Sequence, residues 1–325
     1  MEVRKLQKTG GASLTVTLPK KWVKDLALED KSLVNITVDN QNCLIIQPSP
    51  IKKSLLRSSL SLDGLSAATL TQKLIAHYIS GVDEIVIYCK KILPEQRTQV
   101  RELCSELIGF ELLDESSEKI VLKNVFDPSK FSMSQNVEKM FLITKSMLED
   151  AYKALAQQDL VLASDVINRD SEVDKFQIAI TRQLYTCIRK DIVMEEMGLT
   201  EIDLFFYQNI ATQVERIADH TVKIAKTVAT SEIVGTPIRT SSVITGYLAQ
   251  LLLESHEMIE TLNSNKAHEI LEISQEIENQ IYSKKTRKHT VTFAWEVLED
   301  SLDRIRGYIM NMAEITIDQA VLKIK

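Results

Sequence analysis

The chain has 325 residues, of which 44% are hydrophobic and 26% charged, and its formal net charge at pH 7 is −6. These proportions are ordinary for a globular protein, and the length allows two or three domains. The four cysteines form no Cys-x-x-Cys pair, so neither a disulfide framework nor a zinc knuckle is expected. No apolar run approaches the ~18 residues of a transmembrane helix, and the N-terminus lacks the apolar core of a signal peptide, so the sequence predicts a cytoplasmic protein without direct membrane insertion.

The charge is unevenly distributed along the chain. Residues 1–60 hold ten Lys and Arg against five Asp and Glu, whereas the remaining residues carry a net charge of −11. A basic N-terminal segment followed by an acidic remainder favours an anionic binding partner for the N-terminal segment.

Residues 1–49 predict a small β unit. VRKLQKT and SLTVTLP read as strands on either side of a Gly-Gly turn, Pro19 opens a short amphipathic helix, and LVNITV and CLIIQP are two further strands. Elements this short bury too little apolar surface to form a stable domain from one chain, so we expect a homodimer.

The string RKLQKTGGASLTVTLPKKWVKDLALEDKSLVNITV resembles the AbrB/SpoVT family of swapped-hairpin DNA-binding domains. In that family two chains interleave their hairpins into one barrel, and basic residues near the hairpin contact DNA. The resemblance implies that the DNA-binding residues here are Arg4, Lys5, Lys8, Lys20, Lys21 and Lys24. These side chains supply charge that neutralises phosphates but show no base-reading pattern, and a plain dimerisation module with a solvated basic face is the alternative.

Residues 50–128 predict a small α+β domain. Its strands are expected in SLLRSSLSL, EIVIYC, FELLDES and KIVLKNV, and its helices in AATLTQKLIAHYISG and PEQRTQVRELCSELIG, each closed by a glycine. This segment shows no glycine-rich phosphate loop and no catalytic cluster, so a spacer or dimerisation role is expected, and a regulatory small-molecule site stays open.

From residue 132 to residue 325 the apolar residues recur with the spacing of an amphipathic α-helix. Helices are predicted over 134–157, 159–190, 200–229, 238–264, 266–287 and 290–324. The second of these parallels the fifth, and QVERIADHTVKIAKTV in the third parallels SLDRIRGYIMNMAEITI in the sixth. A duplicated three-helix unit, with repeats at 134–229 and 238–324, explains this best. The expected fold is thus α+β multidomain: an N-terminal swapped-hairpin β-barrel half, a small α+β middle domain and a C-terminal all-α pair of three-helix bundles.

Two pairs of acids mark the first repeat. Asp170 and Asp174 in its second helix are four residues apart, as are Glu215 and Asp219 in its third, so each pair shares one helix face. The pair midpoints, 172 and 217, average to 194.5, which falls in the predicted connection between the two helices. In an antiparallel helical hairpin, the residue numbers of any two facing residues add up to the same total, so their average always falls in the connection. The two acidic pairs satisfy this rule, and the four acids are therefore predicted to lie at the same level and to meet.

Four partly buried carboxylates cannot all stay ionised without a counter-charge. One alternative is a salt-bridge network in which the positive charges come from Arg169, Arg182 and Arg216. The other is a hard divalent or ferric cation with oxygen ligands.

The string ERIADH, following DSEVD by about forty residues in a duplicated six-helix domain, resembles the PhoU family of phosphate-uptake regulators over about 190 residues. In that family such motifs bind metal clusters, iron among them. The resemblance implies a site for iron or another divalent ion, with the ligands Asp170, Asp174, Glu215 and Asp219. In the second repeat these positions hold Ser274, Glu278, Asp303 and Gly307. That copy is predicted to be vestigial, with Glu278 and Asp303 facing each other.

The two resemblances together imply a dimeric regulator of phosphate uptake and phosphate-responsive transcription, in a domain fusion similar to a form common in archaea. The implied partners are DNA and either the ATP-binding subunit of a phosphate transporter or a sensor kinase. The alternative is an accessory protein that restrains a phosphate transporter and uses its N-terminal domain only to dimerise. No catalytic role is expected, because the helical region lacks the Glu-x-x-His motif of a di-iron oxidase and shows no supported nucleophile constellation.

Overall fold

The structure is a computed structural model that describes residues 2–11, 13–38, 42–49, 55–125, 127, 130–189, 194, 197–230, 236–282 and 293–323. Contacts divide the chain into two compact units, Met1–Leu55 and Leu56–Lys325. The second unit contains two hydrophobic cores, one in an α/β layer and one in a helical bundle. The multidomain α+β fold class is confirmed, while the three domain boundaries stay a prediction.

The first unit consists of two hairpins and one short helix. Strand β1 (Gln7–Thr9) pairs antiparallel with β2 (Ser13–Thr15), and β3 (Val34–Val38) pairs antiparallel with β4 (Leu44–Pro48). Helix α1 (Lys20–Asp25) lies between them in sequence. Gly10 adopts the positive φ of +68° that the first turn requires. Among the described residues each hairpin forms a separate two-stranded sheet.

No described residue of this first unit is buried. Its exposed large apolar side chains are Val3, Leu6, Leu14, Val16, Leu26, Leu33, Ile36, Val38, Leu44 and Leu55. Burying one such side chain contributes about 1.5–3 kcal/mol, so leaving all of them in water forgoes most of the stabilisation that a small domain needs. The unit therefore lacks the core that a single chain would have to supply.

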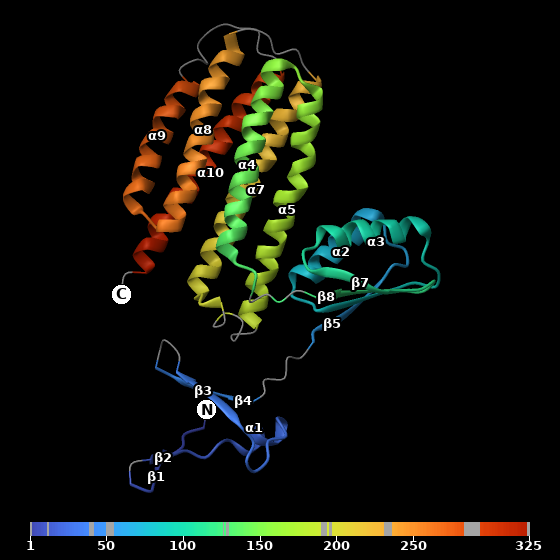
Figure 1. Cartoon of the computed structure of the whole chain (residues 1–325), viewed down its shortest axis with the longest axis vertical. Helices are drawn as coiled ribbons and strands as arrows, with labels where there is room; N and C mark the ends of the chain where they lie inside the picture. Colours follow the sequence, from blue (N-terminus) through green and yellow to red (C-terminus); the bar gives the residue numbers. More distant parts are fainter. Residues whose placement is uncertain are drawn as a thin grey trace. The chain divides into compact units, whose positions relative to one another are not determined.

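The second unit begins with an α/β layer. Its strands are β5 (Arg57–Ser61), β6 (Glu84–Tyr88), β7 (Phe110–Glu115) and β8 (Lys119–Asn124), and its helices are α2 (Ala67–Ile79) and α3 (Pro94–Glu106). The sheet order is β5-β6-β8-β7, with β5 parallel to β6 and the other pairs antiparallel. Both helices lie on one face of the sheet (Figure 1). Leu74 of α2 and Val100 of α3 are fully buried in the core between them and the strands.

The bundle follows, and its helices run side by side in Figure 1. We call α4 (Met133–Gln157), α5 (Leu160–Arg189) and α7 (Glu201–Thr230) the first repeat. We call α8 (Thr236–Thr261), α9 (Ser264–Tyr282) and α10 (Phe293–Leu322) the second repeat. Predicted and observed ends agree within a few residues, except that the predicted ends at 190, 287, 290 and 324 lie outside the described residues. No helix among the described residues is long and apolar enough to span a membrane.

Helix starts follow the side chains that can satisfy free backbone N–H groups. The Ser132 hydroxyl accepts from the backbone N–H of Gln135 at the start of α4. At the start of α7, Thr200 and Asp203 cap each other: the Asp203 carboxylate accepts from the Thr200 backbone N–H, and the Thr200 hydroxyl accepts from that of Asp203.

The α/β layer docks on α5 of the bundle. The buried guanidinium of Arg182 donates to the carbonyl of Tyr78 and lies 4.7 Å from the centre of the Tyr78 ring and 5.1 Å from that of Phe110. Gly81 ends α2 with a φ of +77°, and a Cβ there would lie 3.1 Å from the Thr186 hydroxyl oxygen. Both the backbone conformation and the close approach of α5 therefore select glycine at position 81.

This docking predicts that Gly81→Ala is more destabilising than Gly64→Ala. Both glycines have a positive φ, but a Cβ at Gly64 would meet nothing within 4 Å. The strain common to both substitutions is about 1 kcal/mol. We expect urea denaturation to show an additional loss for Gly81→Ala, because the new methyl group presses on Thr186. Equal losses at the two positions would rule out a tight contact with α5, and Thr186→Ala should shrink the difference.

Candidate metal site and basic hairpin unit

The four predicted acids lie on two helices that pack against each other, α5 and α7. Ile217 and Val214 of α7 and Val173 of α5 are fully buried, which turns the acidic faces of the two helices toward the same seam. Asp170, Asp174 and Glu215 are partly buried, whereas Asp219 is exposed. The period of buried apolar residues thus sets the acids at the edge of the packed seam rather than in open solvent.

These carboxylates are close enough to affect one another's ionisation. Burial, and then the charges of Asp219 and Asp174, raise the pKa of Glu215 to about 7. Burial, and then the charges of Asp170 and Asp219, raise the pKa of Asp174 to about 6. The pKa of Asp170 is also raised, by burial and by the charge of Asp219. The structure therefore brings the four predicted residues together, and holding all of them ionised is unfavourable.

The spacing of the carboxylates is wider than that of a tight ligand set. Within the described part of the chain, no three of the four place one oxygen each within 4.8 Å of the others. None of the four accepts a hydrogen bond or ion pair from another described residue. The charge of Lys226 lowers the pKa of Asp170 and the charge of Arg216 lowers that of Glu215, but burial and mutual repulsion outweigh both.

The three arginines that were the alternative counter-charges make other contacts. Arg169 pairs with Asp150 at 2.8 Å and with Asp165 at 3.0 Å. Arg182 binds the α/β layer, as described above. Arg216 lies over the ring of Tyr308 in α10, 5.7 Å from its centre. Among the described residues, none of the three forms an ion pair with the four acids.

One neighbouring acid was missed from the sequence. Glu106, the last residue of α3, adds to the raised pKa of Asp174 through its charge. It belongs to the α/β layer, and no periodicity in the sequence indicates where that layer docks on α5. A fifth carboxylate therefore lies near the acidic seam.

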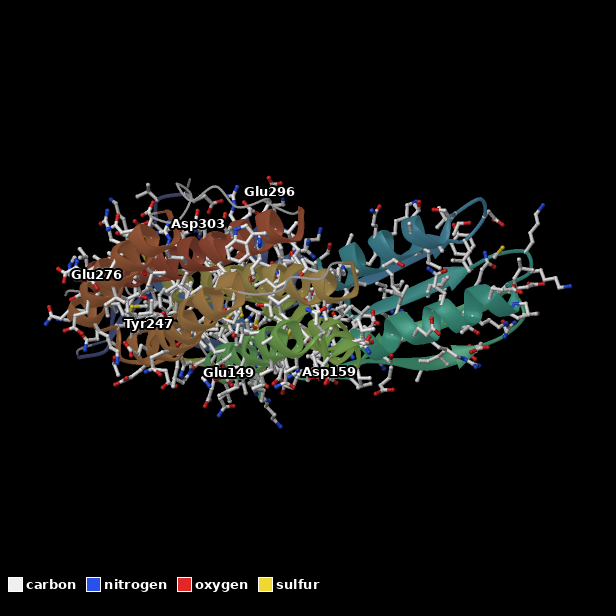
Figure 2. All side chains as sticks on the ribbon, turned by 90° about the horizontal axis from the view of Figure 1, so that it is seen from above. Glu149, Asp159, Tyr247, Glu276, Glu296 and Asp303 are labelled. Atoms are coloured by element: carbon white, nitrogen blue, oxygen red, sulfur yellow. The ribbon has the colours of Figure 1, made fainter. Side chains whose placement is uncertain are left out.

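The second repeat shows the corresponding acids with a counter-charge. Arg306 of α10 pairs with Glu278 of α9 at 3.3 Å and with Asp303 at 2.8 Å, and its side chain is only 10% exposed. Figure 2 separates Asp303, on the orange-red second repeat, from Glu149 and Asp159 on the green first repeat. The two acids predicted to face each other thus share one guanidinium. In the alignment of the two copies, Arg306 stands where the first repeat has the fully buried Ala218.

The basic residues predicted to contact DNA are exposed on the first unit. Arg4 pairs with Glu2 at 2.6 Å and donates to the hydroxyl of Thr17. Among the described residues, the predicted lysines of α1, of β1 and of the segment before β1 form no ion pair. They are Lys5, Lys8, Lys20, Lys21 and Lys24. Their charge is therefore available to an anionic partner.

The fold and the acidic seam define a class: a helical-bundle protein with paired acids on adjoining helices, preceded by a hairpin unit. Residues 137–228 match the family model of the PhoU domain, and residues 7–54 match that of MazE, described as an antidote-toxin recognition domain and bacterial antitoxin. The chain thus carries a PhoU domain and, ahead of it, a domain of the MazE/AbrB type. The PhoU match covers all four acids of the first repeat.

Two similar proteins carry the same domain name. A phosphate-specific transport system accessory protein, PhoU homolog 1 of Thermotoga maritima, is 31% identical over 91 residues, which make up 28% of this chain and 37% of that protein. The match thus spans little more than a third of the relative's length. The crystal structure of the phosphate transport system regulatory protein PhoU from Streptococcus pneumoniae aligns with a TM-score of 0.51 at 18% identity, over 59% of this chain and 95% of that chain. This second likeness shows the fold.

The raised pKa values predict that the metal-free protein loses stability as the pH rises from about 4 to about 7. In this window the folded chain holds protons on Asp174 and Glu215 that the unfolded chain releases, so increasing pH favours unfolding. Glu215→Gln should remove part of this slope. At pH 8 it should stabilise the metal-free protein by roughly 1 kcal/mol after allowance for solvent screening, measured by urea denaturation with a chelator present.

Arg306→Ala provides the contrasting variant. It leaves Glu278 and Asp303 without their shared cation, so it should lower stability by roughly 1–3 kcal/mol at the same pH. If Glu215→Gln also proved destabilising at pH 8, the four acids of the first repeat would not be repelling one another.

Proposed function

We propose that this protein is a cytoplasmic regulator of phosphate uptake and phosphate-responsive transcription, in which the helical domain binds a metal cation and the hairpin unit binds DNA. The observation that carries the proposal is the group of four mutually repelling acids on α5 and α7, three of them with a raised pKa, inside the stretch that matches the PhoU domain. Two proteins with that domain name are described as parts of phosphate transport systems. We assign the protein a regulatory rather than a catalytic role.

The donor set fits a hard cation. Asp170, Asp174, Glu215 and Asp219 offer carboxylate oxygens only, which suit a ferric ion or a hard divalent ion better than a soft one. A bound cation would offset the burial and the mutual repulsion that raise the pKa values of Asp170, Asp174 and Glu215. The comparison with Arg306 supports this, because there the corresponding acids are held together by a positive charge from within the chain.

A homodimer built through the hairpin unit follows from the missing core. The exposed apolar side chains of the two hairpins need a covering surface, and interleaving with the hairpins of a second chain is the arrangement that the AbrB/SpoVT resemblance implies. Such a dimer carries twice as many exposed lysines as one hairpin unit, and the larger positive charge strengthens its attraction to DNA phosphates. The helical domain would then relay the phosphate signal through a transporter ATP-binding subunit or a sensor kinase.

The metal role is tested by elemental analysis and thermal melting of the purified full-length protein. Wild type should retain bound iron or another hard cation and melt at a lower temperature after chelation, because a ligand of the folded state stabilises it by mass action. Asp219→Asn should reduce both the metal content per chain and the melting shift. Glu172→Gln, an exposed acid on the same helix as Asp174, is the matched control and should behave like wild type. Identical metal content in Asp219→Asn and wild type would refute this site.

The DNA role is tested by gel shifts at several salt concentrations with promoter fragments from phosphate-transport genes. Replacing Lys20 and Lys21 with Ala should weaken binding and reduce the slope of log affinity against log salt by about two units, because each lysine is expected to neutralise one phosphate. The control is the same double change at Lys90 and Lys91, an exposed Lys-Lys pair of the α/β layer.

The gel shift also separates the proposal from its rival. If wild type binds no DNA, or binds equally well after the Lys20 and Lys21 changes, the hairpin unit is a dimerisation module only. Co-purification with a phosphate transporter ATP-binding subunit in that case would favour an accessory protein that restrains transport.

A further inference from the structure

A second group of ligand-type side chains lies on other helices than the acidic seam. Glu138 projects from α4, and His256 and Glu260 project from α8; one ligand atom from each lies within 4.8 Å of the other two. Within the part of the chain that the structure describes, this is the one group of three or more His, Cys, Asp or Glu residues that converge so closely. His256 and Glu260 share a helix face because they are four residues apart.

The imidazole of this group is held in position but lacks a close partner. The His256 ring packs against Phe141, with 5.4 Å between ring centres, and its side chain is 16% exposed. Its Nε2 atom lies 3.7 Å from the Glu260 carboxylate, which is too far for a good hydrogen bond. Among the described residues, no lysine or arginine pairs with Glu138 or Glu260. Two carboxylates therefore face one imidazole with no fixed cation beside them.

The chemistry of these three groups selects a class of ion. Calcium and magnesium favour oxygen ligands alone, whereas an imidazole nitrogen with two carboxylates suits zinc and neighbouring divalent transition metals. In a tetrahedral zinc site with bonds of about 2.1 Å, the ligand atoms lie about 3.4 Å apart. The ligand atoms all lie within 4.8 Å of one another, so their separations exceed this by about 1.4 Å at most. Rotation of the two glutamate side chains can close such a gap without moving the helices.

We propose that Glu138, His256 and Glu260 form a three-ligand site for a divalent transition cation such as Zn²⁺, which joins the first repeat to the second. Glu138 lies on the first helix of the first repeat, and the other two ligands lie on the first helix of the second repeat. Helices α4 and α8 pack against each other, so the ion ties the two repeats together across their seam. Three protein ligands leave a fourth position for water or an anion. This site does not depend on the acids of α5 and α7.

Calorimetric titration of the chelator-treated full-length chain with Zn²⁺ tests the site. The background is Asp219→Asn, which weakens binding at the acidic seam. We expect one Zn²⁺ per chain, a rise in melting temperature on binding, and visible absorption bands from a nitrogen–oxygen site when Co²⁺ replaces Zn²⁺. His256→Gln should weaken Zn²⁺ binding at least tenfold and abolish the Co²⁺ bands. Glu260→Gln, a change at an exposed position with little risk to folding, should also weaken it.

His268→Gln is the matched control, because His268 is an exposed histidine on α9 outside the group. It should leave the stoichiometry and affinity unchanged. The proposal fails if the Asp219→Asn chain binds no Zn²⁺, or if His256→Gln and Glu260→Gln bind it as tightly as their parent. In that outcome, His256 would only pack against Phe141 beside the two carboxylates. Failure here leaves the proposed regulatory function intact, because the two sites share no residue.

Discussion

Carboxylates gathered at a packed helix seam are unfavourable unless protons or a positive charge neutralise them, and this constraint applies to both repeats of the bundle. The two repeats meet it differently. In the second repeat Arg306 lies between Glu278 and Asp303 and supplies the charge from within the chain. In the first repeat the corresponding residue is Ala218, which is fully buried and uncharged, while the nearby acids have raised pKa values. The first repeat thus keeps partly buried carboxylates that repel one another, and an external cation can offset this repulsion.

The hairpin unit also lacks something that it needs, namely a surface that covers its apolar side chains. Short strands joined by tight turns expose one face of each hairpin, and the described residues of this unit bury none of it. The period-2 alternation over segments such as β3 (Val34–Val38) is typical of a strand with one covered face, which is why we propose that a second molecule covers it. The lysines of α1 lie on the same small body, so a dimer through this unit also brings two basic surfaces together.

The sequence and the structure agree most closely where one physical rule decides the outcome. The 3.6-residue period predicted the bundle helices, and the constant sum of positions in a hairpin predicted that Asp170 and Asp174 lie near Glu215 and Asp219. Contacts between distant segments were beyond such rules. Nothing local indicates that Glu106 lies near Asp174, or that Arg182 binds the carbonyl of Tyr78. The group of Glu138 and His256 was missed for the same reason, because it spans two repeats whose mutual packing the periodicity leaves open.

Helix α5 connects the acidic seam to the α/β layer. Asp174 lies in the seam, Arg182 lies two turns further along against Tyr78 and Phe110, and Arg189 donates to the carbonyl of Ser80. The same layer places Glu106 near Asp174, where like charges oppose the docking that Arg182 stabilises. A cation bound at the seam would cancel that repulsion and strengthen the docking of the layer on α5. On the proposed function, occupancy of the site would then favour attachment of the α/β layer, because both depend on the charges along α5.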